Sequence, residues 1–255
     1  MNIAVIMKRT FDTEEKITVR NNLIVEDGAE FIINPYDEYA LEEAITLRDE
    51  HGGEVTVVTV GEEEAEKELR TALAMGADKA VLIDSEDVEE LDEFSIAIIL
   101  ATFLKDKNYD IILGGNVGVD GGSGQIGPRV AELLEIPQAT TITNITLEGN
   151  KATIVRDVEG DEETLEVMLP ILITAQQGLN EPRYPSLPGI MKAKKKPLET
   201  ITIEDLDLEE EVEARTKTVE IFLPAKKQAG RVLEGEVSDQ VKELVSLLKS
   251  DVKVI

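Results

Sequence analysis

The sequence predicts an α/β fold, a three-layer sandwich with a mostly parallel sheet, followed by a C-terminal arm. Short β-branched runs alternate four times with segments of helical apolar spacing in the first half of the chain. The run at 55–60, VTVVTV, is apolar almost without interruption, as in a parallel strand covered on both faces. The 255 residues also provide ample length for a buried core.

The elements of the first half are predicted from their apolar runs and from the residues that start and stop them. Asn34 is a good N-cap residue, Pro35 takes the first helical position, and Asp37 suits the positive end of the helix. The predicted order is a strand at 2–7, a hairpin at 18–25 around Asn21-Asn22, a helix from 35 to Gly52, a strand at 54–60, a helix at 62–75, a strand at 80–83, a helix at 93–105 and a strand at 110–113.

The most informative stretch is the glycine-rich loop after the fourth strand. Six glycines lie between Gly114 and Gly124, and helical apolar spacing begins at Ile126. Glycines let backbone N–H groups approach an anion, and the first turn of the next helix adds free N–H donors. We interpret the loop as a cradle for a nucleotide phosphate, with Ser123 and Gln125 as side-chain partners. The alternative is a tight connection that binds nothing.

Residues 122–127 also satisfy the pattern G-x-G-x-x-G, which is typical of dinucleotide-binding folds. In those folds the first glycine directly follows the strand, whereas Val117, Val119 and Asp120 intervene here. The nearest acid about 20 residues further on, Glu148, lies in a turn-like LEGN. The pattern is therefore discounted.

Several charged or flexible positions fall at the carboxyl ends of the predicted parallel strands. Lys8-Arg9, the Val60-Gly61 turn and the glycine-rich loop all belong to this edge, where ligands bind in open α/β sheets. Lys8 and Arg9 suit a bound phosphate or flavin, or they form a solvated pair.

The composition excludes several classes of function. With 53 acidic against 26 basic side chains, the net charge of −27 disfavours nucleic acid and anionic membranes as partners. There is no cysteine, and His51 is the single histidine, so we expect no metal site and no catalytic nucleophile. Without an apolar run of membrane length or a signal peptide, we expect a cytoplasmic protein, or less favourably a mitochondrial matrix protein without its transit peptide.

After Pro137 the sequence pattern changes from alternating strands and helices to mainly strands. We predict strands at 139–147 and 151–158 around a Gly149-Asn150 turn, and further strand structure at 164–174. Three prolines then make 181–189 a stiff exposed loop that carries Leu187. The basic run 192–196 is either a solvated helix end or a surface that steers an acidic partner.

The tail is predicted to contain an acidic linker, a strand and an amphipathic helix. The linker spans 204–213, the strand spans 218–223, and the helix begins at Ser238 with an apolar face of Val241, Leu244, Val245 and Leu248. This helix packs either on another subunit or on its own domain. We therefore divide the chain into a nucleotide-binding domain, 1–200, and a C-terminal extension, 201–255.

The run IVRDVEGDEETLEVMLPILIT, at 154–174, resembles the signature of the electron transfer flavoprotein beta subunit family. The resemblance extends to RTALAMGAD at 70–78, to NEPRYPSLPGIMKAKKK at 180–196, and to Asp120 with the SGQ at 123–125. It covers nearly the whole chain. It implies the adenine nucleotide alpha hydrolase-like form of the three-layer sandwich and an electron carrier subunit, not an enzyme in its own right.

The resemblance also implies cofactors. In this family the beta subunit buries AMP, and its alpha partner holds most of the FAD. Tyr36 matches a flavin-facing aromatic residue, whereas a second aromatic position of the animal proteins is Thr13 here. The cofactor-binding residues implied are Ile6, Lys8, Asn34, Tyr36, Val60, Gly61, Asp120, Gly121, Gly122, Ser123, Gly124 and Gln125.

The partners implied are an alpha subunit in a heterodimer, acyl-CoA dehydrogenases as donors in fatty acid β-oxidation, and a membrane quinone oxidoreductase as acceptor. The surface implied to dock on the dehydrogenases has Leu187 as its apolar anchor and comprises Glu181, Arg183, Leu187, Pro188, Ile190 and Met191.

Two alternatives remain at this point. A bifurcating branch of the family binds a second FAD in the beta subunit and uses NADH; its members read KQVPD, NPDD and GDTAQ where this chain reads KRTFD, NPYD and GGSGQ. The AMP branch is therefore favoured. An ATP- or AMP-binding regulatory module of the stress-protein type would instead form a self-sufficient homodimer.

Overall fold

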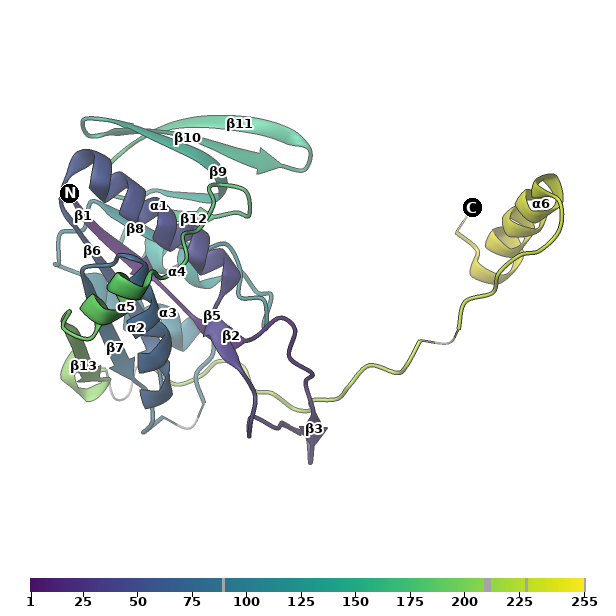
Figure 1. Ribbon diagram of the computed structural model, residues 1–255, viewed down its shortest axis with the longest axis horizontal. Helices are drawn as coiled ribbons and strands as arrows, with labels where there is room; N and C mark the ends of the chain where they lie inside the picture. Colours follow the sequence, from purple (N-terminus) through teal and green to yellow (C-terminus); the bar gives the residue numbers. More distant parts are fainter. Residues whose placement is uncertain (89, 209–211, 228, 255) are drawn as a thin grey trace.

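The computed structural model describes residues 1–88, 90–208, 212–227 and 229–254. Its centre is a nine-stranded sheet with the order β11-β10-β9-β12-β8-β1-β6-β7-β13 (Figure 1). The strands are β1 (Asn2–Ile6), β6 (Glu54–Gly61), β7 (Lys79–Asp84), β8 (Ile111–Gly115), β9 (Gln138–Glu148), β10 (Lys151–Val158), β11 (Asp161–Met168), β12 (Ile171–Ala175) and β13 (Leu198–Thr202). From β9 to β13 in this order every pairing is parallel, and β10 runs antiparallel to both β9 and β11.

Two small antiparallel ribbons precede the first long helix. One pairs β2 (Arg9–Phe11) with β5 (Phe31–Ile33), and the other pairs β3 (Val19–Arg20) with β4 (Leu23–Ile24). The second is the predicted hairpin: Asn21 and Asn22 both have positive φ, 51° and 62°, as a two-residue turn between twisted strands requires.

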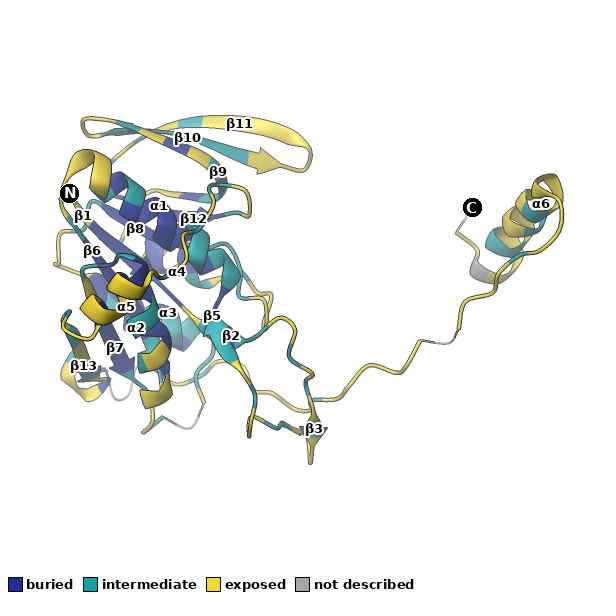
Figure 2. Cartoon of the chain, in the orientation of Figure 1, coloured by how far each residue is buried: buried dark blue, intermediate teal, exposed yellow. Residues whose placement is uncertain are grey.

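Helices cover both faces of the sheet, which confirms the predicted three layers. The core on one face is built from α1 (Pro35–His51) and α2 (Glu66–Met75), and the core on the other face from α3 (Glu93–Leu104) and α4 (Ile126–Leu133). Figure 2 shows the strands between them as the most deeply buried layer. The other helices are η1 (Glu63–Ala65), α5 (Leu187–Ala193), η2 (Glu204–Leu206), α6 (Val237–Leu247) and η3 (Leu248–Val252).

The strand order reverses beside β1. The chain runs from β1 outward to β6 and β7 on one side, and then returns to place β8 on the other side of β1. The carboxyl ends of β1 and β8 lie side by side, because Ile6 pairs with Gly114. In open α/β sheets the crevice at such a reversal, beyond the carboxyl ends of the strands, is the usual ligand site.

The folded body extends further along the chain than the predicted boundary at residue 200, which falls inside β13. This strand, which the sequence analysis did not predict, pairs with β7. Beyond it, Ile203, Leu208 and Val212 are buried in the core that contains α3.

The predicted strand at 218–223 is wrong, because this segment is an extended coil. Val219 and Phe222 are 91% and 71% exposed. Its β-branched composition suits a strand, but a strand needs a neighbour to satisfy its backbone N–H and C=O groups.

The predicted amphipathic helix is present as α6, which stands away from the body at the end of the arm (Figure 1). None of its residues is buried, and Val241 and Leu244 on its apolar face are about half exposed (Figure 2). The alternative that this helix packs on its own domain does not hold in this structure. No helix in the described part of the chain is both long and apolar enough to cross a membrane.

Candidate functional site

A cavity of about 590 Å³ lies at the carboxyl ends of β1 and β8. It is bounded by the end of β1, the start of α1, the glycine-rich loop, the start of α3 and two threonines of the C-terminal arm. Most of the predicted cofactor residues line it, namely Ile6, Lys8, Asn34, Val60, Asp120, Gly121, Gly122, Ser123, Gly124 and Gln125. Tyr36 and Gly61 are not among its lining residues.

The glycine-rich loop folds back on itself to form one wall. The Gly122 N–H donates to the Gly118 carbonyl oxygen over 2.8 Å. Gly124 has a φ of +60°, a backbone conformation that residues with a Cβ rarely adopt. Asp120 pairs with the Lys8 ammonium at 2.8 Å and accepts from the Gly121 N–H at 2.7 Å. The loop is thereby tied to the end of β1 across the cavity mouth.

Asn34 occupies the N-cap position of α1, but its side chain does not cap the helix as predicted. Its Nδ2 donates to the Val117 carbonyl oxygen over 3.0 Å, and its Oδ1 accepts from the Val119 N–H over 3.1 Å. The amide thus matches a donor and an acceptor of the glycine-rich loop, more than 80 positions away. This pairing fixes the loop on the start of α1.

Asp37 is the principal residue of this wall that the sequence analysis left out of the site. Its carboxylate is 5% exposed and accepts from the backbone N–H groups of Lys8 and Gly115, each over 2.7 Å. Burial raises the pKa of Asp37 to about 7, against the lowering effect of these two hydrogen bonds. A Cβ at Gly115 would lie 2.4 Å from Asp37 Oδ1, so only glycine permits the approach.

A further part of the cavity lining was not predicted from the sequence, namely Glu90 to Glu93, Ile96, Leu100, Thr216 and Thr218. Asp92 lies three residues before Ser95 and accepts from its N–H over 3.0 Å, as an N-cap residue does. That spacing was a readable signal for the start of α3. No local pattern connects it with Thr216.

The start of α4 suits an anion. Gln125 stands at its N-cap position without a side-chain cap, and the cavity reaches Ile126 and Gly127 in the first turn. First-turn N–H groups have no partner within a helix and lie at its positive end. The Gln125 carboxamide oxygen accepts from the Arg129 guanidinium at 2.7 Å, which leaves its NH₂ group as the donor it can offer. The residues present therefore fit a phosphate.

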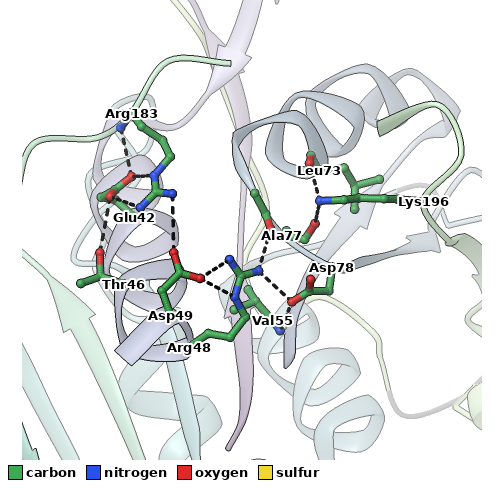
Figure 3. Close-up of polar contacts among 11 residues, drawn as sticks. Glu42, Thr46, Arg48, Asp49, Val55, Leu73, Ala77, Asp78, Arg183 and Lys196 are labelled. Atoms are coloured by element: carbon green, nitrogen blue, oxygen red, sulfur yellow. Dashed lines mark hydrogen bonds and ion pairs between the residues drawn. The ribbon is translucent and has the colours of Figure 1, made fainter. Parts of the chain in front are cut away.

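A second candidate surface is the segment 180–196, which packs over α1 and α2 (Figure 3). Arg183 forms a two-pronged ion pair with Glu42, with both N–O distances at 2.8 Å. Burial acts to raise the pKa of Glu42, but the hydrogen bonds and charge of Arg183 outweigh it and lower that pKa. Arg183, although named among the docking residues, is thus engaged within the chain.

The far end of this segment is also anchored. The Lys196 ammonium donates to the Leu73 and Ala77 carbonyl oxygens at the end of α2, over 3.0 and 2.5 Å (Figure 3). Lys196 therefore lies apart from the exposed cations Lys192, Lys194 and Lys195. Its role resembles that of a cation at a helix C-terminus.

Between these anchors the segment exposes apolar side chains. Leu187 is 80% exposed and Met191 is 73% exposed. Glu181, Arg183, Pro188 and Ile190 also lie at the surface. Leu187 begins α5 and does not lie in a loop as predicted. Ser186 caps this helix by accepting from the Gly189 N–H over 3.1 Å, so the apolar residues are held on a formed helix.

Within residues 1–88, 90–208, 212–227 and 229–254, no three or more His, Cys, Asp or Glu side chains are placed so that they could hold a metal ion.

Comparison with known proteins assigns the family. Residues 21–206 match the family model described as the electron transfer flavoprotein domain. The chain is 64% identical, over the full length of both proteins, to the electron transfer flavoprotein subunit beta of Bacillus subtilis. It is 36% identical to the caffeyl-CoA reductase-Etf complex subunit CarD of Acetobacterium woodii, over 98% of both chains. It is 35% identical to the human electron transfer flavoprotein subunit beta, over 98% of this chain and 97% of the human one. The chain therefore belongs to the electron transfer flavoprotein beta subunit family.

Proposed function

We propose that this beta subunit binds AMP in the cavity at the ends of β1 and β8 and joins an alpha subunit to hold FAD. The heterodimer would carry electrons from acyl-CoA and other dehydrogenases to a membrane quinone oxidoreductase. We also propose a cytoplasmic location, because the Bacillus subtilis relative is a bacterial protein.

The observation that carries the AMP assignment is the match between the cavity and an adenylate phosphate. The glycine-rich loop and the uncapped first turn of α4 line the same space, and backbone N–H groups of a helix N-terminus favour a bound phosphate. The Lys8 ammonium stands at its mouth. The phosphate would bind these donors, and Ser123 and Gln125 would add side-chain contacts.

FAD, when bound, supplies the redox chemistry. Tyr36 is the residue of this chain that we assign to the flavin side. Tyr36 lies at the start of α1 beside Gly115 and outside the cavity lining, which suits contact with a group held mainly by the alpha subunit. The arm with α6 would pack on that subunit, since Val241 and Leu244 on its apolar face are about half exposed.

The segment 180–196 would dock on the dehydrogenase. Leu187 is the proposed anchor, and Ile190 and Met191 extend the apolar surface. Central apolar anchors with a charged rim are typical of protein interfaces, and the exposed Lys192, Lys194 and Lys195 supply such a rim.

Cofactor stoichiometry tests the proposal. The chain is purified with its alpha partner, and the released nucleotides are separated and counted. One AMP and one FAD per heterodimer would support the proposed carrier. Two FAD with NADH oxidation would indicate the bifurcating branch, and ATP on a homodimer of the chain alone would indicate a regulatory module. Recovery of FAD without any adenylate would refute the assignment of the cavity.

A further inference from the structure

Asp92 connects the start of α3 with Arg215 and Thr216, which lie 123 and 124 positions further along the chain. Its Oδ1 accepts from the N–H groups of Phe94 and Ser95 and from the Ser95 hydroxyl, at 3.0 to 3.1 Å, and so caps α3. Its Oδ2 accepts from the N–H groups of Arg215 and Thr216, each over 2.8 Å, and from the Thr216 hydroxyl over 3.0 Å. One carboxylate thus serves six donors. Hydrogen bonds to an ionised acceptor are stronger than neutral ones.

These contacts lie at the point where the arm leaves the body. Just before it, Val212 is buried in the core beneath α3, and just after it, Val219 is 91% exposed. The Arg215 guanidinium also lies over the Phe94 ring, 4.7 Å from its centre. The Asp92 contacts therefore hold the start of the arm, which extends away from the body further along the chain (Figure 1).

The same contacts border the nucleotide cavity. Asp92 lines it, and so do Thr216 and Thr218 of the arm. Two residues that are two positions apart in an extended segment point to the same side, which is how both threonines reach the cavity. The glycine-rich loop lines the same cavity.

We propose that residues 215–218 are a wall of the adenylate site, that Thr216 and Thr218 contact the bound nucleotide, and that Asp92 is the positioning residue that holds this wall in place. The proposal rests on the proposed AMP site. It adds ligand contacts from the C-terminal arm, which the glycine-rich loop gives no reason to expect. Burial acts to raise the pKa of Asp92, but the hydrogen bonds from Ser95, Thr216 and Arg215 lower it overall, so the carboxylate remains charged at neutral pH.

The direction in which AMP affinity changes when Asp92 is substituted distinguishes a positioning role from a purely electrostatic one. A carboxylate beside a phosphate repels it, so removal of the Asp92 charge alone would tighten AMP binding. If Asp92 holds a wall that contacts AMP, removal of its arm contacts weakens binding.

The substitution Asp92→Asn is nearly isosteric and keeps the cap, because asparagine caps helices as well as aspartate does. Its NH₂ group, however, would face the donors Arg215 N–H and Thr216 N–H. Thr216→Val is a second variant, which removes one hydrogen bond and leaves the cap untouched. Asp87→Asn is the control, since it removes an exposed charge from the same connection.

The variants are made in the full chain, purified with the alpha partner and stripped of nucleotide. AMP affinity is measured by titration calorimetry, and exchange of the 215–218 amides is measured by hydrogen–deuterium exchange. We expect Asp92→Asn to weaken AMP binding about tenfold and Thr216→Val about threefold, in line with the loss of charge-assisted hydrogen bonds. In both, these amides should exchange faster, whereas Asp87→Asn should bind AMP at least as well as the unaltered protein.

Three outcomes would overturn the proposal. AMP binding by Asp92→Asn equal to or tighter than that of the unaltered protein, with faster exchange, would show that the wall does not contact the ligand. Unchanged exchange in Asp92→Asn would show that Asp92 does not hold the arm. If the unaltered heterodimer takes up no AMP, the proposed function itself fails and the wall assignment fails with it, while the exchange comparison still decides whether Asp92 holds the arm.

Discussion

The Asp37 carboxylate accepts a hydrogen bond from the backbone N–H of Gly115, 78 positions later in the chain, over 2.7 Å. Its other oxygen accepts from the Lys8 N–H over the same distance. Asp37 therefore joins the ends of β1 and β8 to the first turn of α1. It positions the backbone on which the glycine-rich loop is built.

This carboxylate should make stability depend on pH. The unfolded chain ionises Asp37 near pH 3.8, whereas the folded chain holds the proton to about pH 7. The folded state therefore binds more protons in this window, and the contribution of Asp37 to the unfolding free energy falls as pH rises through it. Asp37→Asn should remove this pH dependence. The stability of the variant relative to that of the unaltered protein should therefore rise as the pH increases from about 4 to about 7. Urea unfolding at several pH values measures the difference, and a difference that does not vary with pH would contradict the prediction.

Gly124→Ala should reduce nucleotide binding. Gly124 has a φ of +60°, and a left-handed conformation costs a residue with a Cβ about 1–2 kcal/mol. The loop should shift to relieve this strain, and the AMP retained per heterodimer should fall. Gly230→Ala is the control, because Gly230 does not line the cavity, a Cβ there meets no atom within 4 Å, and its φ lies outside the left-handed region. Equal AMP content in the two variants would rule out a role for the loop conformation.

Glu42→Gln should destabilise the chain by about 2 kcal/mol, the scale of a hydrogen-bonded charged pair. The variant removes the nearer carboxylate partner of the Arg183 guanidinium, leaves Asp49, at 3.8 Å, as the more distant one, and loosens the start of the segment 180–196. Denaturant unfolding measures the loss. Glu50→Gln is the control, since the Glu50 side chain is 65% exposed. If both variants unfold alike, the Glu42–Arg183 pair does not anchor the segment.

Leu187→Ala should weaken electron acceptance from an acyl-CoA dehydrogenase and leave FAD content and alpha binding unchanged. Loss of a buried leucine from an interface costs about 1.5–3 kcal/mol, so the apparent affinity for the dehydrogenase should fall roughly tenfold or more. Steady-state reduction of the heterodimer measures this. Leu133→Ala, which removes a half-exposed leucine from α4, is the control. Loss of FAD in the Leu187 variant would remove the docking assignment.

Leu244→Asp should weaken assembly with the alpha subunit. The substitution puts a charge on the apolar face of α6, where the Leu244 side chain is 47% exposed. We expect an affinity at least about tenfold lower, because a buried unpaired charge is costly. Ser246→Asp adds the same charge on the opposite face of the helix and should assemble normally. Co-purification and titration of the two subunits compare them, and equal affinities would place the interface elsewhere.

The sequence by itself determined the parts of this protein that depend on neighbours along the chain. The alternation of strands and helices, the Asn21-Asn22 turn and the glycine-rich connection before α4 are all encoded within a few residues. They arise from side-chain periodicity and from backbone preferences, and these act locally. The resemblance carried by the run at 154–174 likewise needed no coordinates to point to the family that the comparisons confirm.

Only the tertiary structure decided which distant groups meet. The Asn34 side chain bonds the glycine-rich loop because a matching donor and acceptor lie there, although the residue type favours a cap. The segment 198–202 is a strand because its backbone pairs with β7, whereas 218–223 is not paired with a strand in the described part of the chain. Asp92 reaches Thr216 in the same way, across 124 positions. Such contacts depend on the packing of whole layers, which the local pattern of a single segment does not contain.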